Sequence, residues 1–305
     1  MRPAEPEIIH QDHAARAAFI ALTLTYGAPT PGLGSRYADD GSGPAHEARM
    51  LGAAEIRAVL LETANYSLGQ TLSRAVLASK QLTGFADHRA AAYLAPLVKA
   101  NVTGVGVGKS LDEAGIEDAR DFLAVFGEPE SGGPRREDRA LVGALDVAIL
   151  GSRRVMLRDV MRFASRGDPL ARDYATAFEI SRDLSRPAIL SALSRGDSSR
   201  AAVVQGYLET LAEVPDLDVV ARAGEREAEE VSRMARGVVK AGGVHSRRGL
   251  EGVSNLGGLL REDSRLSPTA TEPAVIAAAY LVCIEHGPGV LARSIRATAH
   301  RNRGR

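Results

Sequence analysis

Residues 202–213 read AVVQGYLETLAE, and their apolar side chains repeat with a helical period. Apolar residues at positions i, i+3, i+4 and i+7 fall on one face of an α-helix, as burial of one side requires. The residues spaced in this way are Val204, Tyr207, Leu208 and Leu211. The same spacing recurs in residues 141–149, 156–164 and 276–284. Because this helical period recurs along the chain, we predict an all-α fold.

Capping residues, prolines and glycines divide the chain into helices of about 12–20 residues. Ser67 can cap a helix that stops near Gly84, and Asp87 can cap one that runs to Ala100. A second helix is expected from about Ala45 to Ala64, and another from Ser110 or Asp112 to near Gly127. Further helices are expected to begin near Pro6, Arg139, Arg153, Asp168, Arg186, Asp197, Pro215, Glu225, Arg248 and Thr271. Clear period-2 strands are missing, because the glycines of residues 102–107 favour a loop there.

The organisation that follows is a single compact multi-helix domain spanning residues 1–305. The polar stretch 128–137, with its prolines and glycines, is expected to be an exposed loop. The arginine-rich residues 293–305 are expected to form a basic, frayed tail. Small residues on the helix faces permit a homodimer without requiring one.

The composition narrows the classes of function. Lys plus Arg and Asp plus Glu both number 38, so the neutral chain has no general attraction to nucleic acid or anionic lipid. Trp is absent, and the one cysteine, Cys283, cannot form an internal disulfide or a multi-cysteine metal site. No apolar run approaches the ~20 residues that span a bilayer, and the first residues do not resemble a signal peptide. We therefore expect a cytoplasmic protein.

One glycine-rich stretch is similar to a nucleotide-binding motif. Residues 103–110, TGVGVGKS, nearly match a P-loop, but Thr103 replaces its first glycine. The segment before it reads as a helix, whereas a P-loop follows a buried strand. A flexible connector with an exposed Lys109 is the favoured interpretation.

Two other turns group residues that suit phosphate binding and proton transfer. Residues 29–36, PTPGLGSR, precede a His46-Glu47 pair at the start of a helix, and residues 84–89, GFADHR, place Asp, His and Arg at another helix start. Arg binds phosphate, and His or Glu can transfer a proton. Each turn also fits a simple cap with solvated charges, and both interpretations stay open.

The order of these turns resembles the triphosphoribosyl-dephospho-CoA synthase family. Residues 28–36 resemble its Pro-Lys-Pro-Gly-Leu-Val-Asp-Arg motif, Ala45-His46 its Ala-His element, and residues 84–90 its Asn-Thr-His-Lys-Gly element. Similar stretches in the C-terminal half are 157–174, 211–222 and 266–271. The resemblance covers residues 15–285, most of the chain.

This resemblance implies an enzyme that joins ATP to 3′-dephospho-CoA. The acceptor's ribose 2′-hydroxyl displaces adenine from the anomeric carbon of ATP. The product is the precursor of the prosthetic group of citrate or malonate lyase-type acyl carrier proteins. ATP is then a substrate, and Mg²⁺ is expected to accompany its triphosphate. No metal ligands can be assigned.

Site residues follow from the same resemblance, motif by motif. The candidates are, for catalysis, His46, His88, Glu47 and Asp87, and, for nucleotide binding, Arg36, Arg89, Gly32 and Ser35. The arginines would hold phosphate, and His46 or His88 would transfer the proton. Glu47 and Asp87 are candidates for a magnesium or base role. Glu213 and Asp216 lie in a matching motif and equally fit helix capping.

Several positions depart from the family pattern. Thr30 stands in place of Lys, Ser35 in place of Asp, Ala86-Asp87 in place of Asn-Thr, Thr269 in place of Gly and Pro273 in place of Asp. Two alternatives to the family reaction therefore remain. The chain could use another acceptor in an archaeal-type one-carbon cofactor pathway (tetrahydromethanopterin-like), or be a non-catalytic helical binding protein.

Overall fold

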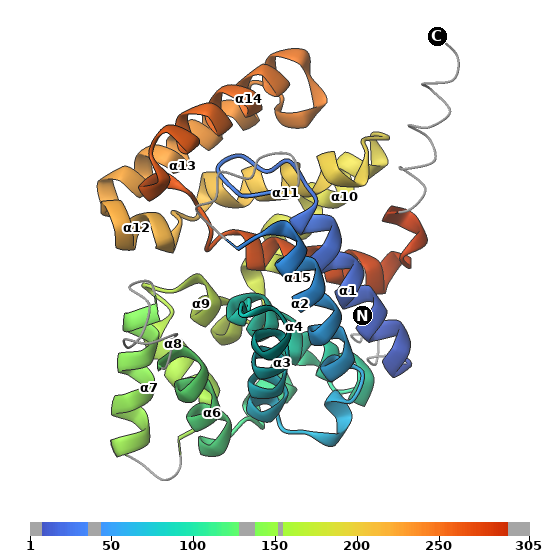
Figure 1. Ribbon diagram of the computed structural model, residues 1–305, viewed down its shortest axis with the longest axis vertical. Helices are drawn as coiled ribbons and strands as arrows, with labels where there is room; N and C mark the ends of the chain where they lie inside the picture. The colour runs from blue at the N-terminus through green and yellow to red at the C-terminus, as the bar shows by residue number, and fades with distance from the viewer. Residues whose placement is uncertain (1–7, 36–43, 128–137, 152–154, 292–305) are drawn as a thin grey trace, which may run out of the picture. The chain divides into compact units, whose positions relative to one another are not determined.

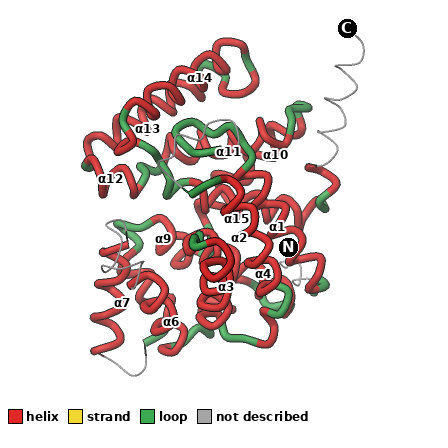
Figure 2. Tube along the Cα trace, in the orientation of Figure 1, coloured by secondary structure: helices red, strands yellow, loops and turns green. Residues whose placement is uncertain are grey.

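The computed structural model describes residues 8–35, 44–127, 138–151 and 155–291. Every regular element in these ranges is a helix, so the predicted all-α fold is confirmed (Figure 2). Within the same ranges, no helix is both long enough and apolar enough to cross a bilayer.

The chain divides into two compact units. Unit 1 comprises Met1–Phe19 and Leu51–Glu179, and unit 2 comprises Ile20–Met50 and Ile180–Arg305. The divisions near the N-terminus fall inside two helices, α1 (Gln11–Tyr26) and α2 (His46–Leu60). The single domain that the composition suggests stays a prediction.

Unit 1 is built around a buried helix, α4 (His88–Thr103), whose residues from His88 to Val98 are all buried. The other elements that lie wholly within unit 1 are η1 (Thr63–Asn65), α3 (Leu68–Thr83), α5 (Val107–Asp112), α6 (Ile116–Gly127), α7 (Arg139–Gly151), α8 (Leu157–Ala164) and α9 (Pro169–Thr176). The Tyr174 hydroxyl of α9 donates to the Ala92 carbonyl of α4 at 2.6 Å. This bond fixes the two helices where the candidate residues of α4 lie.

The caps of α3 and α4 are those that the sequence predicts. Ser67 and Gln70 form a capping box, in which each side chain bonds the backbone N–H of the other residue. Gly84 ends α3 at φ +70°, a conformation that glycine adopts without strain. Asp87 accepts the Ala90 N–H at 2.9 Å and so starts α4.

The P-loop interpretation is excluded by the elements around it. A helix, α4, precedes the glycines, and Val107–Asp112 already forms α5. The loop expected from the glycines of residues 102–107 is therefore shorter, because α4 runs to Thr103 and Gly106 is the N-cap of α5. Lys109 and Ser110 are helical residues with no phosphate-cradling loop before them.

Unit 2 is assembled on α11 (Ser199–Glu213), the helix predicted from the opening stretch. The other elements are η3 (Ile180–Ser185, a π-helical turn), α10 (Arg186–Ser194), α12 (Leu217–Ala223), α13 (Glu225–Lys240), η4 (Gly243–His245), α14 (Arg247–Glu262), η5 (Ser264–Leu266) and α15 (Glu272–His286). Val204, Tyr207, Leu208 and Leu211 are all buried, as predicted. α13 and α14 lie side by side as a helical hairpin, and α11 packs on α13 (Figure 1).

Some predicted boundaries are wrong by a few residues or cannot be compared. The second helix ends at Leu60 rather than near Ala64, and a 3₁₀ turn follows it. Lys99 Nζ holds that turn by donating to the carbonyls of Thr63 and Tyr66, a contact that local sequence cannot reveal. The predictions for Arg36, for residues 128–137 and for the C-terminal tail lie outside the described residues.

Candidate functional site

The loop of residues 28–35, which we call the Pro-Gly loop, turns at Gly32. Gly32 has φ +76°, and a Cβ there would lie 2.8 Å from Leu260 and 2.9 Å from Pro268. Both the backbone conformation and the close packing therefore require glycine. The loop thus rests on α14 and on the segment between α14 and α15.

The Tyr207 hydroxyl fixes the Pro-Gly loop to that segment. It lies 3.3 Å from the Pro31 carbonyl oxygen and 3.1 Å from the Pro268 carbonyl oxygen, and its one proton is shared between them. Burial raises the pKa of Tyr207, and the carboxylates of Asp216 and Glu272 raise it further. The hydroxyl therefore stays protonated and remains a donor.

Arg49 of α2 fixes the loop on the other side of Gly32, at Gly34. Its Nη1 donates to the Gly34 carbonyl at 3.3 Å, and its Nη2 forms an ion pair with Glu272 at the start of α15. The guanidinium also stacks over the Tyr26 ring, 3.8 Å from the centroid. Arg49 is only 9% exposed, so this pair is held away from bulk water.

Two candidate catalytic residues begin the same helix. His46 and Glu47 form the first turn of α2, where a carboxylate is favoured by the helix dipole. His46 and Arg49 are three residues apart and so lie on neighbouring positions of the helix surface. Within the described residues, the buried His46 Nδ1 has no hydrogen-bond partner. Glu47 is exposed.

The segment of residues 264–271, which we call the Pro268 segment, is hydrogen-bonded to Asp216, the N-cap of α12, and to Arg222 of the same helix. Asp216 caps α12 through the N–H groups of Asp218 and Val219, and its Oδ2 accepts from the Thr271 N–H at 2.7 Å and hydroxyl at 2.8 Å. Arg222 donates to the Ser267 carbonyl. The capping role that we kept open for Asp216 is therefore the observed one, whereas Glu213 is exposed.

Unit 1 contains a buried ionic group that we call the Arg89 cluster, made of His88, Arg89, Asp138 and Asp168. Arg89 Nε and Nη2 donate to Asp138 Oδ1 at 2.9 and 2.6 Å. Its Nη1 and Nη2 also donate to the two oxygens of Asp168 at 3.3 and 2.8 Å. Arg89 is 6% exposed, and each aspartate is 1% exposed. The guanidinium predicted to hold phosphate is thus held by two carboxylates.

His88 completes the cluster. Its Nε2 lies 2.9 Å from Asp138 Oδ2, and its ring meets Phe126 edge-on at 4.9 Å between centroids. Burial disfavours the charged Asp138, but the hydrogen bond from His88 and the charge of Arg89 outweigh it, and the pKa falls to about 2. The cluster thus sets one guanidinium against two buried carboxyl groups.

A phenol hydroxyl lies close to this cluster. Tyr93 is fully buried on α4, and its hydroxyl has no partner within the described residues. Burial raises its pKa, and the charges of Asp173 and Asp168 add to that effect. Tyr93 therefore stays neutral beside the carboxylates.

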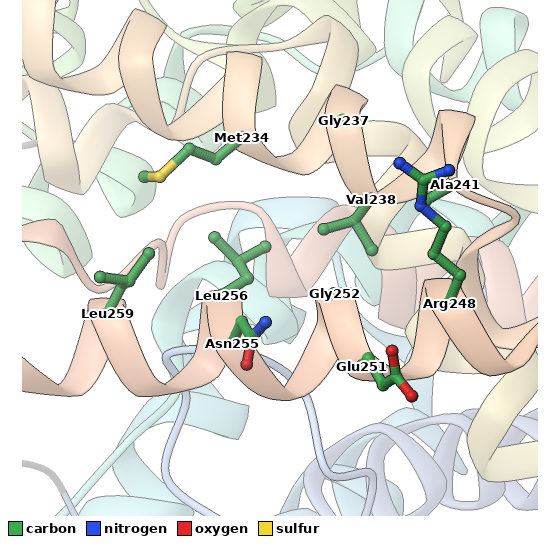
Figure 3. A pocket seen from close by; sticks show the side chains of 10 residues that line it. All are labelled: Met234, Gly237, Val238, Ala241, Arg248, Glu251, Gly252, Asn255, Leu256 and Leu259. Atoms are coloured by element: carbon green, nitrogen blue, oxygen red, sulfur yellow. The ribbon is translucent and has the colours of Figure 1, made fainter.

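A groove of about 390 Å³ separates α13 from α14 (Figure 3). Val238, Leu256 and Leu259 point into it, and Arg248 and Glu251 lie at one end (Figure 3). None of the candidate catalytic or nucleotide-binding residues lines this groove. Its walls are mainly apolar, which does not match the demands of a triphosphate.

The described part of the chain offers no group of three or more His, Cys, Asp and Glu side chains placed to hold a metal ion. Cys283 is buried on α15, where burial raises the pKa of its thiol to about 12. Cys283 therefore belongs to the core around α15.

The structure groups the predicted residues within each unit. In unit 2, Arg49 of α2, the helix that begins with His46 and Glu47, bonds the Gly34 carbonyl of the Pro-Gly loop, which also contains Gly32 and Ser35. In unit 1, Asp87 caps the helix that carries His88 and Arg89. Arg36 lies outside the described residues, and the joint roles of these residues stay predictions.

Sequence reasoning missed several partners. They are Arg49, Glu272, Tyr207, Asp138 and Asp168 in the roles described above. The spacing of Arg49 from His46 is a local signal that could have singled it out. Tyr207 and Asp168 were identified only as a core position and a helix start, and nothing near Asp138 in sequence points to Arg89.

Comparisons with known proteins identify a family and a fold. Residues 11–289 match the family model described as ATP:dephospho-CoA triphosphoribosyl transferase (CitG). A crystal structure named for triphosphoribosyl-dephospho-CoA synthase, from Archaeoglobus fulgidus, superposes with a TM-score of 0.59. It shares 20% sequence identity and covers 80% of this chain and 99% of its own, which shows a common fold. None of the curated proteins matches the chain.

Proposed function

Because the chain belongs to the ATP:dephospho-CoA triphosphoribosyl transferase family, we propose that it transfers the triphosphoribosyl group of ATP to the 2′-hydroxyl of 3′-dephospho-CoA. The match extends over residues 11–289, and this coverage carries the proposal. Adenine is the second product. ATP as donor and the single cysteine favour a cytoplasmic enzyme.

The convergence of the motif segments supports the proposal. In unit 2 the Pro-Gly loop meets the Pro268 segment through Gly32 and Tyr207. In unit 1 the turn at residues 84–90 meets the segment that contains Asp168 through Arg89. Segments far apart in sequence therefore adjoin where the resemblance expects functional residues.

The reaction replaces one bond at the anomeric carbon of ATP by another. The acceptor 2′-oxygen bonds to that carbon, while the bond to adenine breaks and its electron pair leaves with the base. A protein base takes the hydroxyl proton, and an acid supplies a proton to adenine. Negative groups near the ribose stabilise positive charge that develops at the anomeric carbon.

His46 is the better candidate for the proton transfer from the hydroxyl. Its Nδ1 has no partner within the described residues, whereas His88 is already bonded to Asp138. A ring without a carboxylate partner can exchange a proton without breaking an ion pair. His88 and Arg89 then serve to shape the start of α4.

The triphosphate requires positive charge, which we assign to Arg36 at the end of the Pro-Gly loop. Magnesium enters with ATP as the ion of the substrate, for which one or two protein carboxylates are usual. Glu47 is the exposed carboxylate near that loop, and Asp87 is the corresponding candidate in unit 1. Ser35 and Gly32 supply the loop backbone.

The direct test is release of adenine from ATP, followed by chromatography, with and without 3′-dephospho-CoA. We expect release that requires both substrates and a product whose mass equals dephospho-CoA plus triphosphoribose minus water. GTP in place of ATP tests the donor. No adenine with dephospho-CoA would refute the proposal, and acceptor-dependent release only with a pterin-type alcohol would support the other acceptor class.

A further inference from the structure

The Pro-Gly loop is anchored on both sides of Gly32 by side chains from other elements of unit 2. Tyr207 of α11 bonds the Pro31 carbonyl, and Arg49 of α2 bonds the Gly34 carbonyl. These contacts bracket the glycine turn at Gly32. The loop leads directly into Arg36, to which the proposed function assigns the triphosphate.

The two anchors have buried supports of their own. The Tyr207 hydroxyl is shared with Pro268, whose segment is bonded to Asp216 and Arg222. Arg49 is placed by Glu272 and by the Tyr26 ring. Tyr207 and Arg49 are 1% and 9% exposed, so both donate in a dry environment, where a hydrogen bond is electrostatically stronger.

We infer that Tyr207 and Arg49 are positioning residues that hold the Pro-Gly loop in the conformation that binds the triphosphate of ATP. The inference rests on the proposed function. Neither side chain needs to touch substrate. Each fixes a carbonyl of the loop, and together they hold the backbone on both sides of Gly32.

Tyr207→Phe tests this inference because it removes one oxygen and little volume. Tyr174→Phe is the matched control, since Tyr174 is an equally buried tyrosine that donates to a backbone carbonyl, that of Ala92 in unit 1. Both variants lose one buried hydrogen bond, so a general loss of stability affects them alike. Only Tyr207→Phe releases the loop.

The first readout is amide hydrogen exchange. The N–H groups of Thr30 and Leu33 donate to the carbonyls of Ala28 and Thr30 within the loop. In Tyr207→Phe we expect their exchange to be roughly 3- to 10-fold faster, the effect of one lost hydrogen bond on local opening. Tyr174→Phe leaves exchange at residues 28–35 unchanged. Unchanged exchange in Tyr207→Phe would overturn the anchoring role.

The second readout is kinetic. If the loop is displaced, ATP binds less tightly. We then expect KM for ATP to rise at least about fivefold, while kcat changes less than about twofold. Arg49→Lys, which keeps a charge beside Glu272 but loses the planar donor fork, should show the same division between KM and kcat. Faster exchange without a change in KM would overturn the link to ATP. A wild-type chain that releases no adenine refutes the proposed function instead, and the exchange result still decides the anchoring.

Discussion

Arg89 Nη2 lies 2.8 Å from Asp168 Oδ2, and this contact joins the start of α4 to the cap of α9. Asp168 also accepts the N–H groups of Leu170 and Ala171 at the start of α9. The same guanidinium binds Asp138. One buried cation thus fixes three parts of unit 1, and its first effect is on stability.

We expect Arg89→Met to destabilise the protein strongly. Two buried carboxylates would lose their cation, and breaking a buried pair from one side costs about 3–5 kcal/mol. Urea denaturation measures the change. Arg172→Met is the control, because Arg172 and Glu179 form a pair that is nearly half exposed. Such surface pairs contribute about 0–1 kcal/mol. Equal losses in both variants would contradict the role given to the Arg89 cluster.

The low pKa of Asp138 predicts an acid limit to stability. Its pKa is about 2 in the folded chain, below its ordinary value of 3.8, so the folded state favours the charged form. The resulting stabilisation is complete above pH 4 and is lost as the pH falls toward 2. It amounts to roughly 2 kcal/mol, because one pKa unit corresponds to about 1.4 kcal/mol.

Asp138→Asn provides the comparison for this pH dependence. The variant is less stable at neutral pH, and between pH 5 and pH 2 its unfolding free energy should fall by less than that of the wild type. Denaturant titrations at several pH values give both curves. Parallel curves would show that Asp138 does not carry this dependence.

His46 and His88 should respond differently to substitution. His46→Gln is expected to lower kcat by about 10²–10⁴-fold, the usual contribution of a general base, with little change in the denaturation midpoint. His88→Gln is expected to lower the midpoint, because His88 bonds the buried Asp138. Full activity in His46→Gln would exclude it as the base.

The two glycines of the Pro-Gly loop form a matched pair for mutagenesis. Gly32→Ala places a methyl group against Leu260 and Pro268 at a positive φ, a strain of about 1–3 kcal/mol. At Gly34 a Cβ meets nothing within 4 Å, so Gly34→Ala is expected to change stability by less than about 0.5 kcal/mol. Thermal unfolding distinguishes the two. A well-tolerated Gly32→Ala would mean that the turn differs from this structure.

Cys283 should report on unfolding. With its pKa near 12 and its side chain buried, the thiol reacts slowly at pH 8, where little thiolate forms. We expect an aromatic disulfide reagent to label it rapidly in denaturant and only through opening of the structure in buffer. Immediate labelling of the native protein would contradict the buried position on α15.

Local sequence patterns were enough to predict the helices and many of their ends. The apolar period of Val204 to Leu211, the capping box at Ser67 and the glycine at Gly84 act within a few residues, so each can be interpreted without knowing the fold. The family motifs also followed from order and spacing along the chain. The boundary after Leu60 was wrong because Lys99, distant in sequence, holds the turn that follows.

The hydrogen-bond and ion-pair partners of the candidate residues became apparent from tertiary contacts alone. The family resemblance implied a phosphate-binding role for Arg89, but folding places its guanidinium between Asp138 and Asp168. In the sequence, Tyr207 is one predicted core position among many. In the folded chain, its hydroxyl lies against the Pro31 and Pro268 carbonyls. Helix propensity and capping are local interactions, whereas burial of charge and sharing of a hydroxyl depend on segments that meet only when the chain folds.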